Sequence, residues 1–151
     1  MRVILGSDHA GYELKSVLVN FLHQRGDDPI DLGTHSEEPV DYPDYAEKVA
    51  QEILKGDAAK GILICGSGVG ASVTANKFAG IRAGLCHDTY SAHQGVEHDN
   101  MNILVMGSRI IGIELAKELV THFLEAKFSQ VARHQRRLDK IKAIESQRGL
   151  R

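Results

Sequence analysis

The chain has 151 residues, 42% of them hydrophobic, so we expect a single domain spanning residues 1–151. Eighteen Lys and Arg against twenty Asp and Glu give a formal net charge of −2, which argues against nucleic acid or an anionic membrane as a partner. The opening apolar run, 3–5, is too short for a signal peptide and no later run could span a membrane, so we expect a cytoplasmic protein.

Short apolar runs alternate with amphipathic helical patterns along the chain. The runs each end in small or polar residues, as buried parallel strands do, and they cover 3–5, 29–32, 62–64, 82–86 and 103–106. Helical spacing of apolar residues follows in 14–22, 46–54 and 113–124. The alternation predicts an α/β fold with a five-stranded parallel sheet covered on both sides, and ligands at the carboxyl ends of the strands.

Two candidate ligand-binding residues follow the first strand. Asp8 and His9 lie within the segment Gly6 to Gly11 and, by strand order, open onto the same face as the end of the strand 62–64. Asp8 also suits a helix N-cap, because a helical pattern follows it. We favour ligand binding for both residues.

Three alternate glycines separate the strand 62–64 from the next helix. The backbone N–H groups of Gly66, Gly68 and Gly70 can approach a ligand closely, which predicts binding of a phosphate or an oxyanion. Gly66, Gly68 and Ala71, with Asp88 further on, also match a dinucleotide-binding fingerprint, so a nucleotide-binding module is an alternative. Against it, the fingerprint does not follow the first strand, and no second domain remains. A plain turn without a ligand is the other alternative.

Cys65 is the first residue after the same apolar run, at the mouth of the glycine loop. Nearby N–H donors favour a thiolate, which would serve as a base or nucleophile. A cysteine is more often a small buried hydrophobe, but its position beside the loop favours a catalytic role here. Cys86 has no such loop and is expected to be structural, and both thiols are expected to be free.

His98 precedes the strand 103–106 and is a candidate for a second acid or base. A zinc site of Cys65, His87 and His98 lacks a standard ligand spacing, so we expect no metal. Most of the remaining histidines have no obvious partner and are expected at the surface: His23, His35, His87, His93, His122 and His134.

Three arginines are candidates for binding an anion. Arg109 follows the strand 103–106, and Arg133 and Arg137 lie four residues apart in the charged segment 130–147. Like charges at this spacing destabilise an isolated helix by roughly 0.2–0.5 kcal/mol, so an anion such as a sugar phosphate across that face would explain them. A solvated charged face, with Asp139 as counter-ion, is the alternative. The sparse apolar residues of this segment could pack either against its own domain or against a second subunit.

The motifs together resemble those of the type B ribose-5-phosphate isomerases, whose wider family includes the galactose-6-phosphate isomerase subunits. The resemblance runs almost from end to end and rests on Ser7-Asp8-His9-Ala10-Gly11, Asp41-Tyr42-Pro43, Ile64-Cys65-Gly66-Ser67-Gly68-Val69-Gly70, Ala75-Asn76-Lys77, Gly80-Ile81-Arg82-Ala83, Asn102-Ile103-Leu104, Gly107-Ser108-Arg109, Arg133-His134 and Arg137. It implies a Rossmann-like three-layer sandwich, a homodimer or dimer of dimers with shared active sites, and no metal or organic cofactor.

The resemblance also implies a mechanism. Cys65 would take a proton from C2 of the sugar, and the amides of Gly66, Gly68, Val69 and Gly70 would stabilise the enediolate. His98 would open the sugar ring, with Ser67 nearby. The other implied roles are substrate binding by Asp8, His9, Asp99, Arg109, Arg133 and Arg137, the last two across the subunit interface.

Two positions depart from the common pattern of that family. Asp99 stands where many members have asparagine, and Ser67 where threonine is common. A carboxylate facing the site would repel an enediolate, so either the backbone of Asp99 is used or the sugar differs. We expect interconversion of ribose 5-phosphate and ribulose 5-phosphate, with allose, galactose or tetrose phosphates as alternatives. An inactive subunit of a hetero-oligomer is disfavoured because Cys65, His98 and the arginines are present.

Overall fold

The computed structural model describes residues 1–56 and 60–148. The strands are β1 (Arg2–Ser7), β2 (Asp28–Asp31), β3 (Lys60–Cys65), β4 (Ala83–Leu85) and β5 (Ile103–Gly107). The helices are a 3₁₀ turn, η1 (His9–Gly11), and α1 (Tyr12–Gln24), α2 (Tyr42–Leu54), α3 (Val69–Ala75), α4 (Thr89–Asp99), α5 (Ile113–Glu125) and α6 (Ala132–Arg148). None of the helices described here has both the length and the apolar character needed to cross a membrane.

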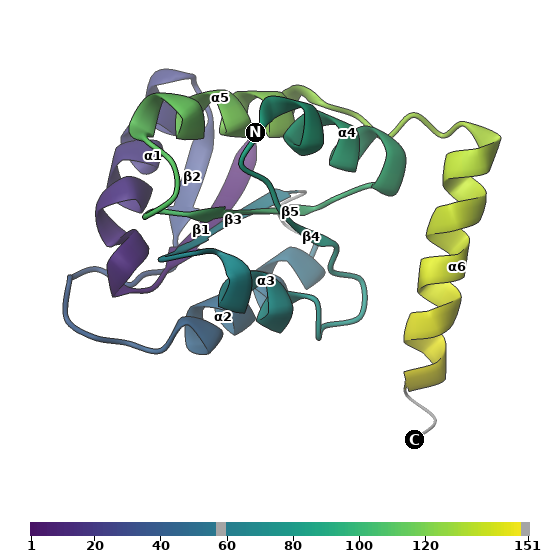
Figure 1. Ribbon diagram of the computed structural model, residues 1–151, viewed down its shortest axis with the longest axis horizontal. Helices are drawn as coiled ribbons and strands as arrows, with labels where there is room; N and C mark the ends of the chain where they lie inside the picture. The colour runs from purple at the N-terminus through teal and green to yellow at the C-terminus, as the bar shows by residue number, and fades with distance from the viewer. Residues whose placement is uncertain (57–59, 149–151) are drawn as a thin grey trace.

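The strands form one sheet in the order β2-β1-β3-β5-β4, and every neighbouring pair is parallel. Helices α1, α4 and α5 cover one face of the sheet, and α2 and α3 cover the other (Figure 1). The predicted α/β three-layer fold with a five-stranded parallel sheet is therefore confirmed. All five strands point the same way, so their carboxyl ends form one edge, where β1 and β3 deliver Asp8 and Cys65.

Burial on both faces explains the uninterrupted apolar runs of the central strands. In β3, Ile62 and Ile64 pack in the cluster beneath α1, α4 and α5, while Leu63 and Cys65 pack in the cluster beneath α2 and α3. This alternation directs the side chain of Cys65 toward the helix that follows the glycine loop.

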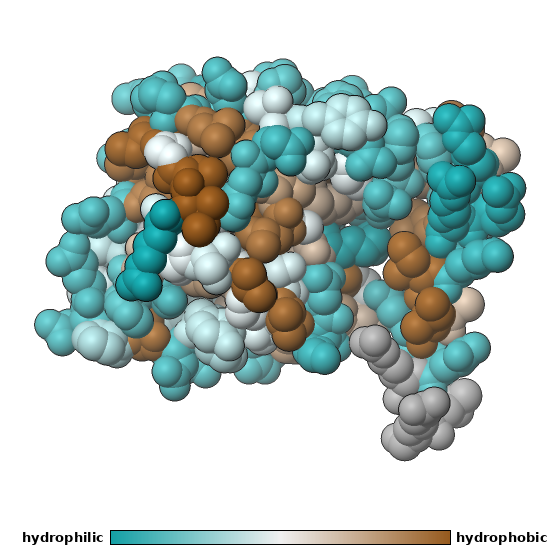
Figure 2. Space-filling model, in the orientation of Figure 1, coloured by the Kyte–Doolittle hydropathy of each residue, from teal (hydrophilic) through white to brown (hydrophobic). Residues whose placement is uncertain are grey.

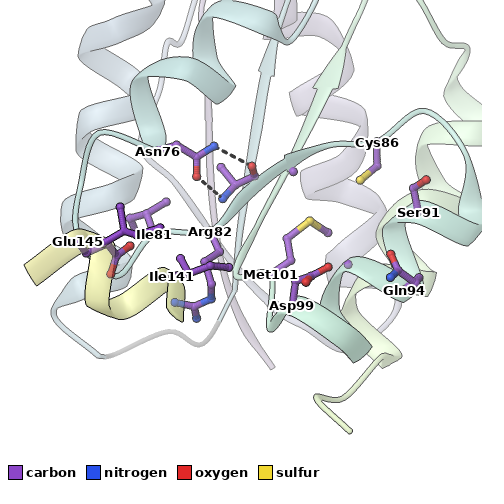
Figure 3. Close-up of a pocket in the computed structure, with 14 residues that line it drawn as sticks. Asn76, Ile81, Arg82, Cys86, Ser91, Gln94, Asp99, Met101, Ile141 and Glu145 are labelled. Atoms are coloured by element: carbon purple, nitrogen blue, oxygen red, sulfur yellow. Dashed lines mark hydrogen bonds between the residues drawn. The ribbon is translucent and has the colours of Figure 1, made fainter. Parts of the chain in front are cut away.

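Helix α6 stands beside the domain, and none of the sheet lies beneath it (Figure 1). Leu138 is buried, whereas Ile141 and Ile144 are exposed. Figure 2 shows apolar side chains on the surface of α6 that faces the rest of the molecule. A groove of about 460 Å³ lies there, and Ile141 and Ile144 of α6 are among the residues that line it. Figure 3 shows Ile141 in this groove together with Met101 of the α4–β5 connection. The helix therefore leaves apolar surface uncovered within its own chain.

Lys60 at the start of β3 ties the sheet to the end of α5. Its ammonium donates to the carbonyl oxygens of Phe123, Leu124 (3.2 Å) and Ala126 (2.9 Å), which have no partner within the helix. Burial lowers the pKa of Lys60 to about 8, so the side chain is still mostly charged at neutral pH.

Replacing Lys60 with methionine is expected to lower the free energy of unfolding by about 1–3 kcal/mol, because three buried carbonyls lose their donor. Urea denaturation followed by circular dichroism measures the effect. Lys55→Met is the matched control, since Lys55 is exposed and pairs with Glu52 at the surface. Equal stabilities of the two variants would show that the Lys60 contacts contribute nothing.

Candidate active site

The sulfur of Cys65 lies against the glycine loop. The N–H of Gly68 donates to Cys65 Sγ over 3.1 Å, and only 4% of Cys65 is exposed. The sulfur of Cys65 therefore lies beside the N–H groups of the glycine loop, as the sequence predicts.

Two of the loop glycines cannot carry a side chain. Gly68 has φ +82°, and a Cβ there would lie 2.5 Å from Leu85 Cδ1 and 3.0 Å from the carbonyl carbon of Met106. A Cβ on Gly70 would lie 2.5 Å from Cζ of Tyr42. The loop is thus held between β5, the end of β4 and an aromatic ring, and this packing fixes the direction of its N–H groups.

The hydroxyl of Ser67 lies within the loop, where its Oγ accepts a hydrogen bond from the N–H of Val69 (3.2 Å). Gly70 and Ala71 follow in the first turn of α3, where amides have no carbonyl partner within the helix. The loop therefore places a hydroxyl and unshared backbone donors next to the cysteine.

Asp8 and His9 lie at the same edge of the sheet. The Asp8 amide bonds to the carbonyl of Ile64 (3.3 Å), the residue before Cys65. Asp8 Oδ1 accepts from the N–H of Gly11 (3.1 Å), so Asp8 is the N-cap of η1. The alternative role predicted for Asp8, that of a helix N-cap, is therefore present. His9 Nδ1 lies 3.1 Å from the backbone nitrogen of Val40 and 3.2 Å from its carbonyl oxygen, so Val40 holds the ring in place with either ring nitrogen protonated.

Arg109 completes this group. Its amide donates to the carbonyl of Gly66 (3.0 Å), and its guanidinium lies 3.6 Å from the position that a Cβ on Gly66 would take. Ser108 donates from its amide to the carbonyl of Cys65 (2.9 Å) and from its hydroxyl to the carbonyl of Ala10 (2.7 Å). These bonds join β5, β3 and η1, and they place a cation over the glycine loop.

Two residues at this edge were not among the predicted site residues. Tyr42 packs against Gly70, and His87 Nε2 accepts from the N–H of Gly107 (2.9 Å). Tyr42 lies in the motif Asp41-Tyr42-Pro43, which was the available signal for it. His87 directly follows the apolar run 82–86, and a residue at the end of a parallel strand is expected at the ligand-binding edge of the sheet.

A second group of predicted site residues lies at the opposite edge of the sheet. Helix α4 begins after β4 and returns to the start of β5, so His98 and Asp99 lie at the amino ends of the strands. The carbonyl of Asn102 accepts from the N–H of Gly61 (2.8 Å), near the start of β3, whereas Cys65 ends that strand. A single chain therefore does not bring His98 to Cys65.

His98 lies against the first turns of α6. Its ring stacks on that of His134, with centroids 4.0 Å apart and 26° between the planes. His134 is only 3% exposed, so the expectation that most unassigned histidines lie at the surface is wrong for this residue. Burial lowers the pKa of His134, and His98, Arg133 and Arg137 lower it further. The two predicted phosphate-binding arginines thus lie near His134, whose ring stacks on that of His98.

Asp99 lines the groove under α6, with Arg82 and Met101 also on its wall (Figure 3). The structure does not place its carboxylate with Cys65. A zinc site of Cys65, His87 and His98 is not assembled, since His98 lies at the other edge. Within residues 1–56 and 60–148, no three His, Cys, Asp or Glu side chains are grouped as metal ligands.

Cys86 is a structural residue, as predicted. Both cysteines are free and buried, and burial, together with Asp88, raises the pKa of the Cys86 thiol to about 11. The side chain therefore stays protonated and packs as a small hydrophobe in the cluster with Met101 and Val96.

Comparison with known proteins identifies the family. Residues 3–141 match the Ribose/Galactose Isomerase family. The chain is 48% identical to ribose-5-phosphate isomerase B of Escherichia coli over 97% of this chain and 98% of that protein. It is 40% identical to D-erythrulose-4-phosphate isomerase of Pectobacterium atrosepticum over 85% of both chains.

Solved structures agree with this assignment. Ribose-5-phosphate isomerase B of Clostridium thermocellum superposes with a TM-score of 0.95 at 46% identity, over 97% of this chain and 99% of that one. The corresponding protein of Thermotoga maritima gives a TM-score of 0.91 at 48% identity, over 94% and 97%. The sequence motifs, the fold and the relatives lead to the same conclusion: this chain belongs to the ribose/galactose isomerase family.

Proposed function

We propose that this protein interconverts ribose 5-phosphate and ribulose 5-phosphate, with Cys65 as the base that moves a proton between C2 and C1. The observation that carries the proposal is the hydrogen bond from the N–H of Gly68 to Cys65 Sγ, within a loop of further backbone donors. Membership of an isomerase family supports the reaction class, and the names of the similar sequences and of the similar solved structures support the substrate.

The proposed reaction uses the sulfur of Cys65 and the backbone donors of the loop. The Cys65 thiolate takes the proton from C2, and the C–H electrons form the C1–C2 double bond while the carbonyl electrons move to O1. Backbone N–H groups of Gly70 and Ala71 are available to this oxyanion. Each well-placed donor stabilises the transition state by about 3–4 kcal/mol. The thiol then returns its proton to C1 as the O2 proton passes to O1, which leaves the ketose and the original thiolate. No step needs a metal ion or an organic cofactor.

The remaining residues at this edge bind the sugar. Asp8 accepts from sugar hydroxyls, His9 offers its Nε2 as a hydrogen-bonding atom, and Arg109 offers a guanidinium to the sugar or its phosphate. Ser67 lies in the loop next to Cys65, where its hydroxyl meets the reacting end of the substrate.

A second copy of the chain completes the site. His98, Arg133 and Arg137 each lie near His134, at the edge of the sheet away from Cys65, and α6 leaves apolar surface uncovered. A homodimer that places these three residues over the partner's glycine loop supplies a histidine for ring opening and two cations for the phosphate. The Asp99 side chain lies in the groove under α6, which favours the use of its backbone rather than its carboxylate. A dimer of dimers and a cytoplasmic location stay predictions.

Solvent-deuterium exchange tests the proposal. Ribose 5-phosphate, allose 6-phosphate, galactose 6-phosphate and erythrose 4-phosphate are incubated with the enzyme in D₂O, and exchange at C2 and ketose formation are followed by NMR. Ribose 5-phosphate is expected to give the highest kcat/KM. No exchange with any of the four sugars would refute the proposed reaction. Binding of NAD in titration calorimetry, without isomerisation, would instead support the nucleotide-binding alternative.

A tetrose phosphate is the second candidate substrate. The observation in its favour is the 40% identity to the Pectobacterium protein, whose name gives D-erythrulose 4-phosphate as its substrate. A kcat/KM for erythrose 4-phosphate above that for ribose 5-phosphate would assign this substrate in place of the pentose.

A further inference from the structure

Three side-chain contacts fix the ring of His98. The amide nitrogen Nε2 of Gln94, one helical turn earlier on α4, lies 2.8 Å from His98 Nδ1. One face of the ring is covered by His134 at 4.0 Å. His134 is held in turn, since its Nδ1 lies 2.7 Å from Ser129 Oγ. The ring can therefore neither flip nor swing without breaking contacts that come from two helices and a loop.

These contacts select one tautomer. An amide nitrogen is only a donor, so Nδ1 of His98 accepts from Gln94 and the neutral ring carries its proton on Nε2.

We propose that Gln94 and His134 are positioning residues that hold the ring of His98 with its Nε2–H directed at the sugar in the second subunit's site. The inference rests on the proposed function. In ring opening, the C1–O4 bond breaks and its electron pair stays on O4. The O1 proton passes to water and O4 takes a proton from water, while the Nε2–H hydrogen bond stabilises the charge developing on O4. His98 then acts as a hydrogen-bond donor and ends the step unchanged.

The chemistry of the substrates separates this step from proton abstraction at carbon. Ribose 5-phosphate is a furanose and must open before it reacts. Ribulose 5-phosphate and erythrose 4-phosphate stay open, because the hydroxyl that would close a five-membered ring carries the phosphate. A defect in His98 positioning is therefore expected to affect only the first of these sugars, whereas a defect in Cys65 affects all three.

The experiment compares Gln94→Glu with Gln94→Leu. A carboxylate at position 94 accepts a hydrogen bond, so it reverses the tautomer and places the proton on Nδ1. Both variants are expected to lower kcat for ribose 5-phosphate by up to about 100-fold, with little change in deuterium exchange into ribulose 5-phosphate. His134→Ala is expected to act in the same way, and His134→Phe, which keeps a stacked ring, to recover part of the loss. Gln24→Glu, at an exposed position on α1, is the control for the added charge.

Nitrogen-15 NMR of the imidazole side chains gives a second readout that a purely structural role would not move. The signal of His98 is identified by its loss in His98→Asn. We expect an unprotonated Nδ1 in the native enzyme and a protonated one in Gln94→Glu. A protonated Nδ1 in the native enzyme, or equal losses of turnover and of ribulose 5-phosphate exchange in the Gln94 variants, would overturn the inference. Exchange that survives Cys65→Ala would instead refute the proposed function.

Discussion

Replacing Cys65 with alanine is expected to lower kcat for ribose 5-phosphate by about 10³-fold or more and to abolish deuterium exchange at C2. The variant keeps the backbone donors of the loop but loses the group that receives the proton. Without a base, the oxyanion that those donors stabilise does not form. A stopped assay of ketose formation and NMR detection of exchange measure the two effects separately.

Cys65→Ser and Cys86→Ala are the matched controls for this prediction. Serine keeps the size and a hydrogen-bonding atom at position 65 but is far less acidic than a thiol, so its activity is expected to stay near that of alanine. Cys86 is buried away from the loop and stays protonated, so its replacement is expected to leave kcat within about twofold of the native value. Circular dichroism checks that all three variants are folded. Retained exchange in a folded Cys65→Ala would remove the cysteine from the mechanism.

Mixing two inactive variants is expected to restore activity. Cys65→Ala and His98→Ala are each expected to be almost inactive toward ribose 5-phosphate. If each site takes Cys65 from one subunit and His98 from the other, a mixed dimer has one native site and one site without either residue. Random exchange of subunits at equal concentrations then returns about a quarter of the native activity. Activity is measured after mild unfolding and joint refolding of the two proteins.

The control for complementation is a protein that carries both substitutions, refolded with the native enzyme. This mixture keeps both residues on one chain, so its mixed dimers each have two sites that lack one residue. The expected activity is again about a quarter, from native dimers alone. Restoration in the first mixture combined with monomeric behaviour in sedimentation would contradict shared sites, and so would the absence of any restoration.

The local parts of the site were predictable because they are contiguous in the sequence. Cys65 and Gly68 are separated by a single turn at the end of a strand, so the residues that form the loop also bring the sulfur to the N–H groups. Asp8 required one further step, the rule that the carboxyl ends of parallel strands lie at one edge of the sheet. The hydrogen bond from the N–H of Asp8 to the carbonyl of Ile64 agrees with that rule.

The burial of His134 was not predictable in the same way. Its neighbours in sequence, Arg133 and Gln135, are polar, and it is covered by His98, which lies far away along the chain. The sequence does indicate where His98 lies, because a residue just before a parallel strand is at the edge of the sheet formed by the amino ends of the strands. This edge is opposite the carboxyl ends, where ligands bind. Tyr42 meets Gly70 only through the packing of α2 against α3.

The predicted helical patterns did not include α4, whereas the five strands, the parallel sheet and the position of the glycine loop after Cys65 were determined by the sequence itself. These features depend on the period of apolar residues and on the conformations that glycine allows, both of which are local properties. Only the tertiary structure decided that the predicted site residues form two groups at opposite edges of one sheet. The physical reason is that α4 must run antiparallel to the strands it connects, which carries His98 away from Cys65 within the same chain.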